Sequence, residues 1–318
     1  MGSEMCIRDR PGAQQTPSWE APPVEYADMH QLIAHIARDW SAWGADARRR
    51  THTPVLNTIR AHSLRWHWSR GRSTASLRVL VPGAGGCRLA WEIARRGHHV
   101  EASDSSDGML LAAHTIITSF RSPPARCANA TWRPRAGRIR LAAQEPACEL
   151  AWPLELFPFA PCGGGVLQRQ ACLQPAIVPD QPIEHACSHK VQLVLQSASF
   201  LSYYGVHEAG LAAWDAIVTS YFLDCLADPV AAVRRVSQLL VRGGLWINVG
   251  PLQWHVPSAG MLRLSWEELR ALLGLHSFKL QRWRILRRVP YLSHPKMRWL
   301  LSASEHWHDV LFFVAIKE

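Results

Sequence analysis

The sequence predicts an α/β fold, in which a mostly parallel sheet carries helices on both faces. From residue 77 onward, short apolar runs alternate with segments whose apolar residues recur at helical spacing. This alternation favours parallel strands, because the helix between two strands brings the chain back to the end of the sheet where the first strand began. With 48% hydrophobic and 19% charged residues, the 318-residue chain can bury a sizeable core, which excludes a wholly disordered protein.

Two segments precede this alternation. Residues 1–25 are expected to be a disordered or non-native lead-in, because residues 1–10 (MGSEMCIRDR) match no later pattern and a stretch rich in Pro, Ala and Gln follows them. Residues 26–76 are predicted to be an N-terminal helical segment, with Asp28 able to cap a helix and Gly44 able to end it. The apolar residues at helical spacing are Met29, Leu32, Ile33, Ile36 and Trp40.

Residues 77–318 are predicted to be one domain that begins with two strand–helix units. An apolar run at 77–82 breaks at glycines, and helical spacing follows at 88–97, so we expect a strand, a turn and a helix. Residues 98–104 are predicted to be the second strand and 109–120 the second helix.

The pattern resumes after an irregular insertion at about 121–189, where Pro, Gly, Cys and Ala leave no clear period. Ser265 and Glu268 stand in capping-box spacing at the start of the last helix. Strands are predicted at 191–200, 214–222, 245–250, 278–286 and 310–316, and helices at 230–240 and 265–273. With the two earlier strands, these make a sheet of seven strands.

Several classes of protein are excluded by composition. No apolar stretch approaches the ~20 residues that cross a bilayer. The eight cysteines contain no CxxC pair, so we expect no zinc or other metal site and no redox dithiol, and we expect reduced thiols in the cytoplasm or nucleus. The formal charge is +10, but the arginines come in scattered groups, as at 48–50, 95–96 and 287–288. The pattern does not favour a nucleic-acid partner.

Small and acidic residues stand where the first two predicted strands end, which is where such sheets bind ligands. Gly83 and Gly85 allow a tight turn and a close ligand approach, and Asp104 follows Gly83 by 21 residues, where a carboxylate can accept bonds from ribose hydroxyls. The ligand should therefore contain adenosine. Arg88 replaces the third glycine of a dinucleotide fingerprint, and no Gly-Lys-Ser/Thr is present, which leaves S-adenosylmethionine. The alternative is that the glycines merely permit a sharp turn.

The chain resembles the carnosine N-methyltransferase family, also described as N2227-like, from about residue 30 to residue 317. The matching stretches are RDWSAWGADARRR with Pro54, VLVPGAGGCRLAWEIARRG, WDAIVTSYFLDCLADP and GGLWINVGPLQWH. The most specific parts are RDWS, VPGAG-x-x-RLAWEIA and WIN-x-GPL. The resemblance implies a class I methyltransferase (Rossmann-like) fold, S-adenosylmethionine as donor, and the imidazole nitrogen of a small histidine-containing peptide, such as carnosine, as acceptor.

The resemblance also implies roles for individual residues. Asp224 and His255 are the implied catalytic residues. The implied cofactor-binding residues are Arg48, Gly83, Gly85, Asp104, Ser199, Phe200 and Ser220. The implied substrate-binding residues are Asp224, His255, Tyr291 and Trp307. Each acceptor residue has a structural alternative: a helix N-cap for Asp224, a loop residue for His255, a surface aromatic for Tyr291 and core packing for Trp307.

The chain departs from the family pattern at three positions. Cys87 replaces a small residue after the glycines, Ser199 replaces the Asp of a Gly-Asp-Phe, and Trp307 stands where a tyrosine is usual. The loss of the Asp removes an acceptor for the adenine amino group, and the loss of the tyrosine removes a hydroxyl from the acceptor pocket. Two alternatives therefore stay open: methylation of histidine in a protein or larger peptide, and a degenerate methyltransferase fold that acts as a binding scaffold. A homodimer is also left open.

Overall fold

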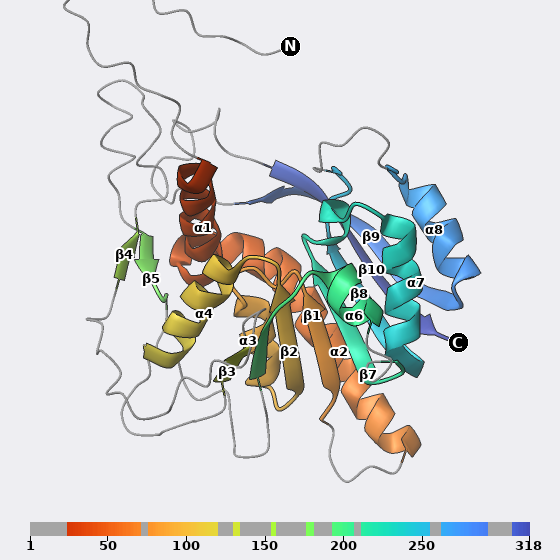
Figure 1. The fold of residues 1–318 in the computed structure, drawn as a ribbon. Coiled ribbons are helices and arrows are strands. Elements are labelled where there is room, and N and C mark those ends of the chain that lie inside the picture. Colours follow the sequence, from red (N-terminus) through yellow and green to blue (C-terminus); the bar gives the residue numbers. More distant parts are fainter. Residues whose placement is uncertain are drawn as a thin grey trace, which may run out of the picture.

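An eight-stranded sheet forms the centre of the molecule (Figure 1). The computed structural model describes residues 24–70, 76–119, 130–133, 154–156, 176–180, 193–206, 211–254, 262–291 and 307–318. The strands of the sheet are β1 (Arg78–Pro82), β2 (His99–Asp104), β3 (Ala130–Arg133), β6 (Leu193–Ser197), β7 (Trp214–Ser220), β8 (Leu240–Gly250), β9 (Phe278–Pro290) and β10 (Trp307–Lys317). Their order is β3-β6-β2-β1-β7-β8-β10-β9.

Most neighbours in this sheet are parallel, as predicted. In the spatial order of the sheet, all neighbouring strands between β3 and β8 are parallel pairs. β10 is antiparallel to both of its neighbours, β8 and β9. All seven predicted strands are present, although the one expected at 191–200 stops at Ser197, and Phe200 begins a helix instead. The mostly parallel α/β sheet is therefore confirmed.

The segment at 121–189 contains strands that the sequence did not predict. β3 extends the sheet to eight strands, and β4 (Leu154–Leu156) pairs antiparallel with β5 (Ala176–Val178). Strands of three or four residues are too short to show a period of two, which is why the pattern missed them. Apart from residues 130–133, 154–156 and 176–180, this segment, like residues 1–23, lies outside the described residues.

Helices cover both faces of the sheet (Figure 1). The alternation along β1 illustrates this, because Val79 and Val81 belong to one buried cluster and Leu80 belongs to the other. The first cluster includes residues of α1 (Val24–Trp40), α2 (Ala45–Arg70), α3 (Arg88–Ala94) and α4 (Asp107–Ser119). The second includes residues of α6 (Phe200–Val206), α7 (Pro229–Leu239) and α8 (Trp266–Leu275). The predicted capping box of Ser265 and Glu268 starts α8.

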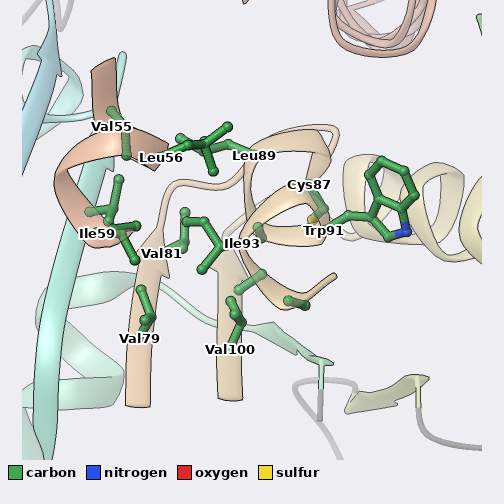
Figure 2. Packing of buried hydrophobic residues seen from close by; sticks show 14 of the residues in the cluster. Val55, Leu56, Ile59, Val79, Val81, Cys87, Leu89, Trp91, Ile93 and Val100 are labelled. Atoms are coloured by element: carbon green, nitrogen blue, oxygen red, sulfur yellow. The ribbon is translucent and has the colours of Figure 1, made fainter. Parts of the chain in front are cut away.

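The two N-terminal helices join the main core. The predicted helix ends at Trp40, and the short 3₁₀ helix η1 (Ala42–Gly44) connects it to the long α2. In Figure 2 the side chains of Val55, Leu56 and Ile59 on α2 lie against Val81 and Leu89. None of the described helices is long and apolar enough to cross a membrane.

The strand order locates the ligand site. From β1 the chain moves outward to β2 and then to the edge strand β3. It comes back to β6, between β3 and β2, and then crosses to β7 on the other side of β1. Ligands of open α/β sheets bind beyond the carboxyl ends of the strands at such a reversal. The loops after β1, β2, β6, β7 and β8 should therefore surround the site.

Candidate active site

A glycine turn follows β1. Gly83 and Gly85 have φ of +62° and +51°, in the left-handed region that glycine tolerates best. A Cβ on Gly83 would lie 2.0 Å from Cδ2 of Phe222, so the aromatic ring packs directly on the backbone of the turn. Gly83 is thus required both for the turn and for the close approach of the loop that follows β7.

Asp104 ends β2 and is fixed against this turn. Its Oδ2 accepts a hydrogen bond from the backbone N–H of Gly85 at 2.8 Å, and its Oδ1 accepts one from Ser106 at 2.9 Å. Burial raises the pKa of the Asp104 carboxyl, although these backbone donors act in the opposite direction. Each oxygen keeps a further acceptor site, so the carboxylate is held in place to accept ribose hydroxyls.

The C-terminal part of α1 lies across the same turn. The indole Nε1 of Trp40 donates to the carbonyl of Gly86 at 2.6 Å. A Cβ on Gly86 would come within 2.7 Å of the Asp39 carboxylate, and one on Gly85 would lie 3.9 Å from Nδ1 of His35. The RDWS stretch therefore covers the glycine turn from the side of the N-terminal helices.

Five polar residues meet beside this turn and are called the α1 cluster: His35, Arg38, Tyr221, Tyr291 and His308. The hydroxyl of Tyr291 lies 2.7 Å from Nε2 of His35. The Arg38 guanidinium lies 4.5 Å from the ring centre of Tyr291 and 5.4 Å from that of Tyr221. The ring of His308 is 5.6 Å from that of Tyr291 and 6.1 Å from that of Tyr221.

Three atoms of the α1 cluster are buried without a hydrogen-bond partner among the described residues: His35 Nδ1, Arg38 Nη1 and Tyr221 Oη. An unsatisfied buried polar group costs ~1–3 kcal/mol. Three such atoms at one place, next to a glycine turn and a fixed carboxylate, indicate a ligand site.

Ionisation in the α1 cluster suits a carboxylate ligand. Arg38 donates from Nε to Asp39 at 2.7 Å; burial would lower the pKa of Arg38, but Asp39, together with Tyr291 and Tyr221, raises it. Burial, assisted by Arg38, lowers the pKa of His35 to about 4, so this imidazole is neutral at pH 7. Burial raises the pKa of Tyr291 to about 12. The cluster thus offers one cationic donor and neutral hydroxyls.

Asp224 lies where β7 and β8 end, in the 3₁₀ helix η3 (Leu223–Cys225), and is 1% exposed. Its Oδ2 accepts a hydrogen bond from the backbone N–H of Gln253, in the loop after β8, at 3.1 Å. The N-cap of α7 is Asp228, which accepts from the N–H of Ala231. Asp224 is therefore not the cap of that helix.

The structure brings most of the other predicted residues to the same edge of the sheet. Phe200 starts α6 after β6, and its ring lies 5.6 Å from that of Phe222, which packs on Gly83. Ser199 directly precedes Phe200, and Ser220 is the last residue of β7. His255 lies outside the described residues.

Two predicted residues lie elsewhere. The described ring contact of Trp307 is with Arg288, 5.6 Å from the ring centre, whereas its neighbour His308 contacts the α1 cluster. Arg48 donates from Nη1 to the carbonyls of Arg38, at 2.5 Å, and of Ser41, at 2.8 Å, and it pairs through Nη2 with Asp180. Its described donors are thus used by protein groups.

The sequence prediction missed the residues that complete the site. They are His35, Arg38, Tyr221, Phe222 and His308. The RDWS motif was visible and contains Arg38, but only the packing of α1 on the glycine turn distinguishes Arg38 from Arg48. Within the part of the chain that the structure describes, no group of three or more His, Cys, Asp or Glu side chains could hold a metal ion.

The parallel sheet, the reversal beside β1, the glycine turn and the acid at the end of β2 define a class I methyltransferase fold. The antiparallel strand β10, inserted between β8 and β9, completes it. The family model for carnosine N-methyltransferase matches residues 18–124 and 147–315, so the chain belongs to that family.

The curated relatives that this chain resembles are also named carnosine N-methyltransferases. Carnosine N-methyltransferase unmet of Drosophila melanogaster is 24% identical over 93% of this chain and 56% of its own length. The carnosine N-methyltransferases of Mus musculus and Schizosaccharomyces pombe are 23% and 27% identical over 81% and 73% of this chain, and over 57% and 55% of their own lengths. The chain thus spans a little over half the length of these relatives. A SAM-dependent methyltransferase structure from Methanosarcina mazei covers 76% of this chain and 92% of its own, at 13% identity and a TM-score of 0.41.

Proposed function

We propose that this protein is an S-adenosylmethionine-dependent N-methyltransferase that methylates the imidazole nitrogen of carnosine, forming anserine, or of a related histidine-containing peptide. The observation that carries the proposal is the set of unpartnered buried atoms His35 Nδ1, Arg38 Nη1 and Tyr221 Oη beside the glycine turn. Membership of the carnosine N-methyltransferase family supports both the reaction and the acceptor.

The residues present fit the donor. Gly83 and Gly85 let the backbone approach it closely, and Asp104 would hold the ribose. Ser199, Phe200 and Ser220 would surround the adenine at the ends of β6 and β7. Arg38, whose Nη1 is unpartnered, is better placed than Arg48 to bind the methionine carboxylate, because the described donors of Arg48 are used elsewhere.

Cys87 does not argue for a degenerate scaffold. Its side chain is fully buried among the apolar residues behind the turn, and burial raises the pKa of the thiol. The residue precedes α3 with φ of 57°. The core therefore accommodates the departure from the family pattern at this position.

For this methyl transfer the protein has to align the imidazole nitrogen with the methyl group and to stabilise the charge that develops on the imidazole. When bound, S-adenosylmethionine supplies an activated methyl group for the unprotonated nitrogen of an imidazole, which is mostly neutral at pH 7 with a pKa near ~6.5. Asp224 would accept a hydrogen bond from the opposite imidazole N–H, select the tautomer and stabilise the imidazolium. Tyr291 and His255 would position the peptide.

Asp224→Asn tests the acceptor assignment. The change keeps the shape but removes the charge, so methyl transfer to carnosine should fall by a hundredfold or more, ~2.7 kcal/mol of transition-state stabilisation, while donor affinity stays nearly constant. The measurements are a radiolabelled transfer assay and calorimetry with S-adenosylmethionine. Asp228→Asn is the matched control, because asparagine also caps a helix and this carboxylate caps α7.

The outcomes separate the candidate functions. No donor binding by the parent protein would favour the scaffold and refute the proposal. Donor binding with transfer to a histidine-containing protein, but none to carnosine, would shift the acceptor to the larger substrate. Full turnover of Asp224→Asn would show that another group holds the imidazole.

A further inference from the structure

A separate pocket lies between α2 and β9. Its volume is about 520 Å³, within the ~300–1,000 Å³ of small-molecule sites. Four arginines line it, Arg49 and Arg50 from α2 and Arg282 and Arg284 from β9, together with Phe312 of β10. None of its lining residues belongs to the α1 cluster or to the glycine turn.

The fold gathers arginines that are more than 200 positions apart in the sequence. Arg282 and Arg284 are two residues apart on a strand, so their side chains point to the same face of the sheet. Both guanidinium groups lie over the ring of Phe312, at 5.7 and 5.4 Å from its centre. Arg49 and Arg50 stand opposite them on α2. The scattered arginines of the sequence therefore form two facing walls.

Internal contacts hold these walls together without neutralising them. Arg50 donates from Nη1 and Nη2 to the backbone carbonyls of Arg288 and Arg287, at 2.7 and 2.6 Å. Arg282 donates to the hydroxyl of Thr58. These acceptors are uncharged, so both guanidinium groups keep their full charge and most of their five N–H donors.

Little negative charge balances the four arginines of the pocket. Among the described residues that line it, none carries a carboxylate. Arg49 pairs with Asp46, but the Arg49 side chain is 72% exposed, and exposed pairs of this kind contribute little. Thr53 and Asn57, which also line the pocket, add neutral hydrogen-bonding groups.

We infer that this pocket binds a small anion that carries two or more phosphate groups. Guanidinium groups match phosphate oxygens with paired donors, and two facing walls suit an anion with charge at both ends. The pocket has the size of a small-molecule site, which favours a compact anion over a nucleic-acid strand. The inference is independent of methyl transfer.

Calorimetry on the whole chain with sodium tripolyphosphate tests this site, with orthophosphate, citrate and single-stranded RNA as comparison ligands. We expect tripolyphosphate to bind at least tenfold more tightly than orthophosphate or citrate, and more weakly as salt rises. The double change Arg282→Gln with Arg284→Gln should weaken it by tenfold or more. The matched control is Arg234→Gln with Arg270→Gln, which removes two exposed arginines from α7 and α8 on the opposite face and should leave binding unchanged.

A second variant guards against misfolding. Arg49→Gln changes an exposed side chain and should weaken tripolyphosphate binding about threefold with an unchanged melting temperature. Binding of S-adenosylmethionine should be unaltered in all these variants. Absence of tripolyphosphate binding, equal loss in the control, citrate binding as tight as tripolyphosphate, or RNA binding tighter than both would overturn the proposal.

Discussion

Two groups of buried polar residues contact α1, and they differ in how completely their polar atoms are paired. In the first, the Asp180 cluster (Arg48, Arg88, Glu92 and Asp180), every charged group has an oppositely charged partner. In the α1 cluster, Arg38 pairs with Asp39, but three buried polar atoms have no partner among the described residues. Buried charges that are paired hold the protein together, whereas unpartnered polar atoms mark a place prepared for a ligand.

The Asp180 cluster ties a distant segment to the N-terminal helices. Asp180 accepts from Arg88 at 2.8 Å and pairs with Arg48, and its backbone N–H donates to the carbonyl of Trp40 at 2.6 Å. Arg88 also pairs with Glu92 at 3.0 Å. Burial would raise the pKa of Glu92, but His52 and Arg88 outweigh it and hold the value at about 2. This carboxyl therefore stays charged throughout the neutral range.

The largest effect is expected for Asp180→Ala. Removal of this carboxylate leaves the guanidinium groups of Arg48 and Arg88 buried with no partner at that position, and loss of one member of a buried pair costs ~3–5 kcal/mol. Urea unfolding should show a loss of that size. Asp46→Ala is the control, since it breaks the exposed pair with Arg49 and should cost at most ~1 kcal/mol. Equal losses of stability in the two variants would show that the buried pairs of Asp180 stabilise the protein no more than the exposed Asp46–Arg49 pair does.

Asp104→Ala tests whether the glycine turn and the α1 cluster beside it bind the donor. If Asp104 accepts the ribose hydroxyls, S-adenosylmethionine should bind more weakly by ~1.5–3 kcal/mol, as for other hydrogen bonds to charged groups. Asp104→Asn keeps an oxygen for the N–H of Gly85 and should lose less. Calorimetry measures both variants, and thermal melts check that they fold. Donor affinity equal to that of the parent would mean that the ribose assignment is wrong.

The sequence predicted the features that depend on neighbours along the chain. Gly83 and Asp104 were predicted because each stands at the end of a predicted strand, which fixes its position. Tyr221 and His308 were missed, because they reach the site from the end of β7 and the start of β10 and meet only in the folded molecule. Arg38 was passed over for the same reason, since helical spacing does not tell which side of α1 packs on the glycine turn.

A smaller effect is expected from pH through His35. The pKa of His35 is about 4 in the folded protein, whereas an exposed histidine, as in the unfolded chain, has a pKa of 6.5. Between these two pH values the unfolded chain therefore binds a proton that the folded chain does not. Stability should therefore be unaffected by His35 above about pH 6.5 and should fall as the pH drops toward 4. His62 and His98, whose pKa values burial also lowers to about 4, contribute in the same sense.

His35→Gln separates the contribution of His35 to the pH dependence of stability from those of His62 and His98. The slope of unfolding free energy against pH, measured by urea titration between pH 6.5 and 4.5, should decrease by up to ~1.4 kcal/mol per pH unit, which corresponds to one proton. An unchanged slope would mean that His35 titrates normally and is not buried beside Arg38.

The smallest effect, and the sharpest comparison, comes from the two tyrosines of the α1 cluster. Tyr221→Phe removes a hydroxyl that has no partner among the described residues, whereas Tyr291→Phe breaks the 2.7 Å hydrogen bond to His35. We therefore expect Tyr221→Phe to leave the unfolding free energy unchanged or to raise it, and Tyr291→Phe to lower it by ~0.5–1.5 kcal/mol. If the Tyr221 hydroxyl serves the donor, calorimetry should show S-adenosylmethionine affinity falling three- to tenfold in Tyr221→Phe. A variant that loses stability without losing affinity would show that this hydroxyl is bonded within the protein, and the α1 cluster would then resemble the Asp180 cluster.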